Sequence, residues 1–127
     1  MKSFLRYWLP VVVLCVIIFW QSSHATPHIL PRWPHQDKVL HCLVYGLLGA
    51  LWVRAFNTLK GFNGRRRILL LTGVVMATMY GLSDEWHQSF VPARTADPAD
   101  LLADFCGSLA GSWVYIRFAL SRMPVAR

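Results

Sequence analysis

Long apolar runs are the feature that most constrains the fold of this chain. Residues 68–80 contain no charged side chain and directly follow Arg65, Arg66 and Arg67. Four apolar segments of about 14–22 residues fit into the sequence, and a helix needs about 20 apolar residues to cross a bilayer. With 55% hydrophobic residues among 127, the chain leaves no room for a separate soluble domain. We therefore expect a single all-α domain over residues 1–127, a polytopic membrane protein folded as a four-helix transmembrane bundle.

The predicted helices cover residues 7–20, 37–56, 68–88 and 99–120. The first is short, and Ser23-His24-Ala25 after it fits the small-x-small pattern of a signal-peptide cleavage site. A retained anchor is favoured because three apolar segments follow, and a cleaved signal peptide is the alternative. Pro10 lies near the expected start of this helix, where a proline is tolerated.

Two aspartates are suited to begin helices. Asp97 precedes Pro98, and an N-cap carboxylate followed by proline is typical of a helix start. Asp37 can cap the second helix in the same way. Lys38, beside it, can extend its amine towards the membrane surface.

The distribution of basic residues predicts the topology. Lysines and arginines are enriched in cytoplasmic segments, and ten of the 13 fall on one side of the four predicted spans. The other side holds only Arg32, Lys38 and Arg94. We therefore expect both termini in the cytoplasm and the loops 21–36 and 89–98 on the outward side.

Several classes of function are disfavoured by composition. The net charge of +7 comes from residues that flank apolar runs, so it does not indicate nucleic-acid binding. Cys15, Cys42 and Cys106 lie in apolar segments without a CxxC motif, which disfavours disulfides and zinc ligation. No cofactor is indicated, and a divalent cation held by carboxylates remains a subsidiary hypothesis.

The acidic residues point to a site, because all six fall between Asp37 and Asp104, at or just inside the ends of apolar segments. Ionisable groups in membrane segments usually face the bundle interior and mark functional sites. At 1.5 Å per residue, His41, Asp84 and Asp104 each lie about 6 Å inside the outer ends of their helices. Arg94, in the loop between the third and fourth helices, is the expected counter-charge. The polar faces, spaced by three or four residues, consist of Asp37, His41 and Tyr45, of Tyr80, Asp84 and Gln88, and of Asp100, Asp104, Gly107 and Gly111.

Small residues favour convergence of these faces. Gly46 and Ala50, Gly107 and Gly111, and Ser108 and Ser112 are small-xxx-small pairs, which allow membrane helices to approach closely.

Two interpretations of the polar residues stay open. Asp84, Glu85, Asp104 and Arg94 form a shared polar site, or they form an ion-pair network that only locks the helices together.

Four motifs in order resemble the VanZ-like family over about residues 37–112. They are Asp37-Lys38-x2-His41-x3-Tyr45, Tyr80-Gly81-x2-Asp84-Glu85-x2-Gln88, Pro92-x-Arg94 and Asp100-x3-Asp104-x2-Gly107. The chain departs from the pattern at Ala93, where the family often has glycine, and at Asp104, where asparagine is common. The family is named for a protein that gives low-level teicoplanin resistance, and its mechanism is not established.

The resemblance and the residues together suggest two functions. The first is a non-catalytic envelope protein whose outward acidic pocket binds a membrane lipid, a lipid-linked envelope precursor or a partner, with an effect on glycopeptide sensitivity. The second is an enzyme acting on a lipid head group, with Asp84, Glu85 and His41 as catalytic candidates. A purely structural membrane subunit is the third possibility. The candidate binding residues are Asp37, Lys38, His41, Tyr45, Tyr80, Asp84, Glu85, Gln88, Arg94, Asp100 and Asp104.

Overall fold

The computed structural model describes residues 2–24 and 33–120. The candidate cleavage site after Ala25, most of the proline-rich loop and the basic tail from residue 121 lie outside these ranges. Helix α1 spans Lys2–Ser22, α2 spans Gln36–Phe56, α3 spans Arg66–Gln88, and α4 spans Pro98–Val114 and continues as the π-helical turn η1, Tyr115–Ala119. The described residues contain no strand, which confirms the all-α, four-helix prediction.

Three helices are long and apolar enough to cross a membrane, over Phe4–Ser22, Gln36–Phe56 and Arg66–Gln88. The 17 residues of α4 and the five of η1 together measure about 33 Å, the thickness of a bilayer core. Large apolar side chains such as Leu43, Leu71 and Phe118 lie exposed on the outer faces of the bundle. These faces are suited to lipid tails.

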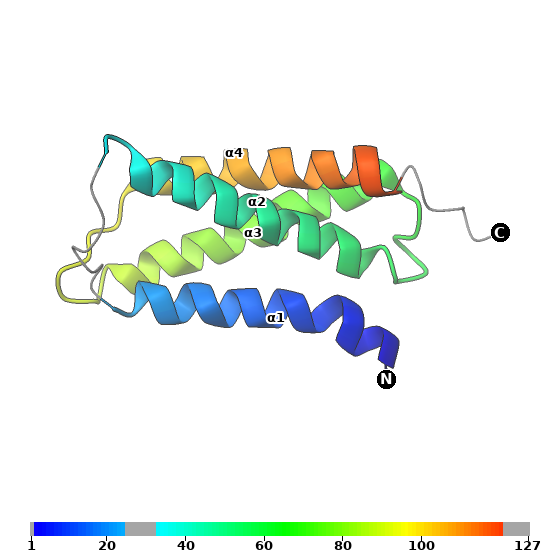
Figure 1. Cartoon of the computed structure of the whole chain (residues 1–127), viewed down its shortest axis with the longest axis horizontal. Coiled ribbons are helices and arrows are strands. Elements are labelled where there is room, and N and C mark those ends of the chain that lie inside the picture. The colour runs from blue at the N-terminus through cyan, green and yellow to red at the C-terminus, as the bar shows by residue number, and fades with distance from the viewer. Residues whose placement is uncertain (1, 25–32, 121–127) are drawn as a thin grey trace.

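Helix α1 begins earlier than the sequence predicted. It starts at Lys2 instead of near Tyr7, so Pro10 lies inside the helix and not in its first turn. An internal proline removes a backbone hydrogen bond and kinks a helix, and α1 bends towards its N-terminal end in Figure 1.

The two predicted N-caps have different outcomes. Asp97 caps α4, because its side chain accepts a hydrogen bond from the backbone N–H of Ala99, at 2.9 Å, with Pro98 as the first helical residue. The prediction for Asp37 was wrong. His35 occupies the N-cap of α2 with φ 64° and makes no side-chain cap hydrogen bond, so Asp37 lies within the first turn.

Figure 1 places the C-terminal ends of α1 and α3 and the N-terminal ends of α2 and α4 at one end of the bundle. We call this the polar end. Helix α4 lies along α2 and α3, whereas α1 packs against α2 and α3 on the opposite side. Both described chain ends reach the other end of the bundle, where Arg54, Arg66 and Arg67 also lie.

Glycines bring α2 and α4 into backbone contact in the middle of the bundle. A Cβ atom on Gly111 would overlap the carbonyl group of Gly46, and one on Gly107 would overlap that of Cys42. The close approach of α2 and α4 therefore depends on these glycines, as the small-xxx-small pairs predicted. The same packing brings the polar first turns of α2 and α4 together.

Candidate functional site

The polar end collects all six acidic residues of the chain, from α2, from the end of α3 and from the start of α4. Four of them are buried: Asp84, Glu85, Asp100 and Asp104 are at most 8% exposed. A buried carboxylate needs hydrogen-bonding or charged partners, because the loss of hydration is costly. The partners of each carboxylate therefore define what this site can do.

His41 and Asp104 form the innermost pair. The Nδ1 atom of His41 lies 2.7 Å from Oδ1 of Asp104, whose side chain is completely buried. Because a carboxylate accepts this hydrogen bond, Nδ1 carries the proton and Nε2 faces Asp100, whose Oδ2 lies 3.7 Å away. The imidazole also stacks on Tyr45, with 6.0 Å between ring centroids. These contacts fix both the position and the orientation of the His41 ring.

Asp84 is held by neutral hydrogen-bond donors from three helices. The hydroxyl of Ser22, at the end of α1, donates to Oδ1, and Gln88 donates to Oδ2 at 3.0 Å. The hydroxyl of Tyr45 lies 3.5 Å from the same oxygen. Asp84 thus joins α1, α2 and α3 without a direct cationic partner among the contacts of the described chain.

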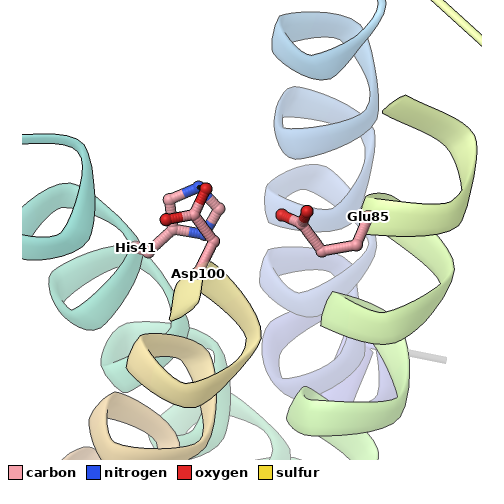
Figure 2. Close-up of side chains that lie close together, drawn as sticks. All are labelled: His41, Glu85 and Asp100. Carbon is pink, nitrogen blue, oxygen red and sulfur yellow. Dashed lines mark ion pairs between the residues drawn. The ribbon is translucent and has the colours of Figure 1, made fainter. Parts of the chain in front are cut away.

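Glu85 has one satisfied and one unsatisfied carboxylate oxygen. The backbone N–H of Asp97 donates to Oε2 at 2.9 Å, which ties the end of α3 to the start of α4. Oε1 is buried and has no hydrogen-bond partner in the part of the chain that the structure describes. Figure 2 shows the Glu85 carboxylate directed towards His41 and Asp100. The three side chains offer one ligand atom each, and these atoms lie within 4.8 Å of one another.

Lys38 is the main counter-charge of the site. Its Nζ atom lies 2.6 Å from Asp97, 2.6 Å from Asp100 and 3.0 Å from Asp37. The amine of Lys38 therefore links the first turn of α2 to the start of α4. The hydrogen bond from Lys38 lowers the pKa of Asp97 below its usual value.

The prediction that Arg94 is the counter-charge was wrong. Its guanidinium donates to the backbone carbonyl of Gln21 at 2.7 Å and to that of His24 at 2.7 and 2.9 Å. The last carbonyl groups of a helix have no partner within the helix, so the end of α1 offers these acceptors to Arg94. Arg94 consequently fastens the α3–α4 loop to α1.

Tyr80 also departs from the expected polar face. Its hydroxyl donates to the backbone carbonyl of Cys15 in α1, at 2.6 Å. The structure thus brings nine of the eleven predicted binding residues together and directs Tyr80 and Arg94 to α1. Asp37 marks the rim of this group, because its side chain is 62% exposed.

The sequence analysis did not predict two roles at the site. Ser22 donates a hydrogen bond to Asp84, and Gly81 leaves room for the side chain of Asp104. A Cβ atom on Gly81 would overlap the Asp104 carboxylate, so the glycine allows that side chain to lie against α3. A glycine two residues before Ser83-Asp84-Glu85 was the available signal for Gly81. The pairing of α1 with α3 is not encoded locally, so no signal pointed to Ser22.

Residues 7–120 match the family model described as VanZ/LLP1, a range that includes most of α1 and all of α2, α3 and α4. The chain belongs to the VanZ/LLP1 family. This confirms the resemblance found in the motifs and extends it through α1. An uncharacterized protein from Schizosaccharomyces pombe is 31% identical over 109 residues, which cover 84% of this chain and 64% of that relative. The chain therefore spans just under two thirds of the length of that relative. No solved structure matches the chain.

Proposed function

We propose that this VanZ/LLP1 protein spans the membrane several times and binds the head group of an envelope lipid, or of a lipid-linked envelope precursor, at its polar end. The observation that carries the proposal is the set of four buried carboxylates where four helix ends meet. Ionisable groups in membrane segments are costly and commonly mark a pathway or a binding site. At the depth of a head group they can be reached by a lipid from the same leaflet.

The basic residues support an outward orientation of the polar end. Ten of the 13 lysines and arginines lie on the opposite side of the predicted spans, which by the positive-inside rule is cytoplasmic. In this orientation both termini are cytoplasmic, and the polar end faces the outer leaflet. A lipid-linked precursor that has crossed the membrane is then within reach.

An apolar groove beside the site supports a lipid as the ligand. The groove measures about 320 Å³ and lies between α1, α2 and α3. Phe19, one turn before Ser22, lines it and stacks on His87 near the polar end, with 4.6 Å between ring centroids. A groove of this kind fits an acyl chain whose head group lies among the carboxylates. It is lined by Val11, Val12, Cys15, Val16, Phe19, Trp52 and Tyr80.

The test is the lipid that remains bound during purification. We expect one lipid class to be enriched, relative to the membrane extract, in wild-type protein purified in mild detergent and measured by mass spectrometry. Asp84→Asn should lose this enrichment, whereas Asp37→Asn at the exposed rim should keep it. A wild-type lipid composition equal to that of the extract would contradict the proposal.

An enzymatic role is the second candidate, and the His41–Asp104 pair favours it. A buried carboxylate that holds Nδ1–H of a histidine leaves Nε2 free to take a proton from water or from a substrate hydroxyl. His41 would serve as the general base in hydrolysis of a head-group ester. Product released from extracted lipids by wild type and not by His41→Gln would support this role, and no product from wild type would exclude it.

Altered glycopeptide sensitivity would be a consequence of head-group binding in the first proposal. Cells that carry wild-type protein should then differ in teicoplanin sensitivity from cells that carry Asp84→Asn at equal protein levels. Equal sensitivity, with the lipid enrichment still different, would separate the antibiotic effect from lipid binding.

A further inference from the structure

The geometry points to a binding site for one divalent transition-metal ion, formed by His41, Glu85 and Asp100. This inference goes beyond lipid binding and does not depend on it. Each side chain comes from a different helix, and all three meet at the polar end (Figure 2). The ligand atoms lie within 4.8 Å of one another. Ligand bonds of about 2.0–2.2 Å at the angles of a tetrahedral or octahedral ion place neighbouring ligands about 3.0–3.6 Å apart, so rotations of the side chains that move the ligand atoms by about 1 Å complete the site.

The unsatisfied oxygen of Glu85 is the first sign of a ligand. Glu85 is 6% exposed, and its buried Oε1 has no hydrogen-bond partner among the described residues. Native proteins rarely leave a buried carboxylate oxygen without a partner, and an ion is one recognised explanation. In Figure 2 this carboxylate faces the space beside His41 and Asp100. A cation in that space would satisfy it.

The orientation of His41 is the second sign. Metal-bound histidines almost always donate their other ring N–H to a carboxylate or a carbonyl group. Asp104 accepts the Nδ1–H hydrogen bond at 2.7 Å, which turns the Nε2 lone pair towards Oδ2 of Asp100, 3.7 Å away. A proton on Nε2 or a metal ion between the two atoms removes their repulsion, and only the metal ion would also bind the unsatisfied oxygen of Glu85. Asp104 would thus be a positioning residue that orients the ligand His41.

Lys38 does not fill this place. Its amine lies at the rim, where it binds Oδ1 of Asp100 and leaves Oδ2 for the ion. Arg94 is also occupied, since its hydrogen bonds go to backbone carbonyl groups at the end of α1. Neither cation of the polar end therefore neutralises Glu85 directly in the part of the chain that the structure describes.

The donor set defines the class of metal. One imidazole nitrogen and two carboxylates suit Mn²⁺ or Zn²⁺, whereas Mg²⁺ and Ca²⁺ prefer oxygen ligands alone. The two carboxylates balance the charge of the ion. Three protein ligands also leave a coordination position open for water or for an oxygen atom of a head group, as in catalytic metal sites.

The experiment is direct metal binding to the full chain in detergent, with any polyhistidine tag removed and all metal first extracted by a chelator. Mn²⁺ alone and Zn²⁺ alone are titrated by calorimetry, and Mg²⁺ serves as the comparison. We expect one transition-metal ion per chain, a higher unfolding temperature in its presence, and binding of Mg²⁺ at least about tenfold weaker.

The variants separate the site from the surrounding acidic residues. Glu85→Gln and His41→Gln should each weaken the binding of Mn²⁺ and Zn²⁺ by at least about tenfold, and Asp104→Asn should weaken it less. Asp37→Asn, which removes an exposed carboxylate of the same end, should leave it unchanged. The inference would be overturned if wild type bound neither Mn²⁺ nor Zn²⁺ saturably, or if wild type and both glutamine variants bound these ions equally well. If a variant does not fold, the titration of wild type still shows whether the chain binds a transition-metal ion.

Discussion

The middle of the bundle and its polar end use the same pair of helices in opposite ways. In the middle, α2 and α4 meet backbone to backbone, and a Cβ atom on Gly111 would overlap Gly46. At the polar end, charged side chains stand between the same helices, with Lys38 between Asp97 and Asp100. Close contact in the middle determines how near the polar first turns lie. Substitutions in the middle should therefore lower stability, and several at the polar end should instead affect binding.

Gly111→Ala should have the largest effect on stability. The added methyl group would overlap the Gly46 carbonyl, and because backbone cannot move away as a side chain can, we expect a loss of about 3 kcal/mol or more. Thermal unfolding in detergent, followed by tryptophan fluorescence, measures it. Gly61→Ala is the control, since its Cβ atom would have no neighbour within 4 Å. Equal stability of both variants would show that the close approach is not required.

Lys38→Met should have the next largest effect. It removes the amine that Asp97 and Asp100 share and leaves a partly exposed and a buried carboxylate to repel each other. The Lys38 side chain is 26% exposed, so solvent screening reduces the loss to about 1–2 kcal/mol. Lys60→Met, in the exposed connection between α2 and α3, should change stability by less than about 0.5 kcal/mol. Equal losses would mean that the charge cluster contributes nothing specific.

Ala93→Gly should raise stability slightly. Ala93 has φ 65°, in the left-handed region where a Cβ atom costs about 1–2 kcal/mol. Greater freedom of glycine in the unfolded chain offsets about 0.4–1 kcal/mol of the gain. We expect a net stabilisation of about 0.5–1 kcal/mol in the same unfolding assay. Ala96→Gly, in the same loop but without a positive φ, should not stabilise the protein.

The pH dependence contributed by Asp97 should be the smallest effect. Its folded-state pKa is lowered, mainly by the hydrogen bond from Lys38. The stability it contributes is therefore fully present above the ordinary pKa, near 3.9, and is lost as the pH falls through the lowered folded value. Asp97→Asn should be less sensitive to acid than wild type between about pH 5 and 2. Identical acid unfolding curves would show that this ion pair is absent in solution.

The sequence predicted the helices well because their apolar runs and breaks are local features. The third helix was expected over residues 68–88 and spans Arg66–Gln88, and the second differs by one residue at its start. The first helix begins at Lys2 and not at residue 7, because the helix includes the basic residues Lys2 and Arg6 before the apolar run. Helix propensity continues through such residues, and charge marks the edge of a membrane better than the end of a helix.

The site was predicted less completely than the helices. Helix periodicity shows which residues share one face of a helix, but it does not show which residues of other helices they contact. The spacing of His41 from Asp37 and of Asp104 from Asp100 placed them on inward faces, and the two meet at 2.7 Å. The partners of Arg94 were not predicted, because they are backbone carbonyl groups at the end of α1 and the pattern of charged residues gives no information about them. The link from Ser22 to Asp84 required knowing that α1 lies beside α3.

The most direct test of the account is the stability of Glu85→Gln in the absence of metal. Glutamine keeps an oxygen to accept the Asp97 N–H and places an amide beside Asp100, so unfolding should occur at the wild-type temperature or above it. That result would mean that the charge of Glu85 is retained for a ligand and not for the fold. A loss of more than about 2 kcal/mol would contradict the account and assign the buried carboxylates to a structural network.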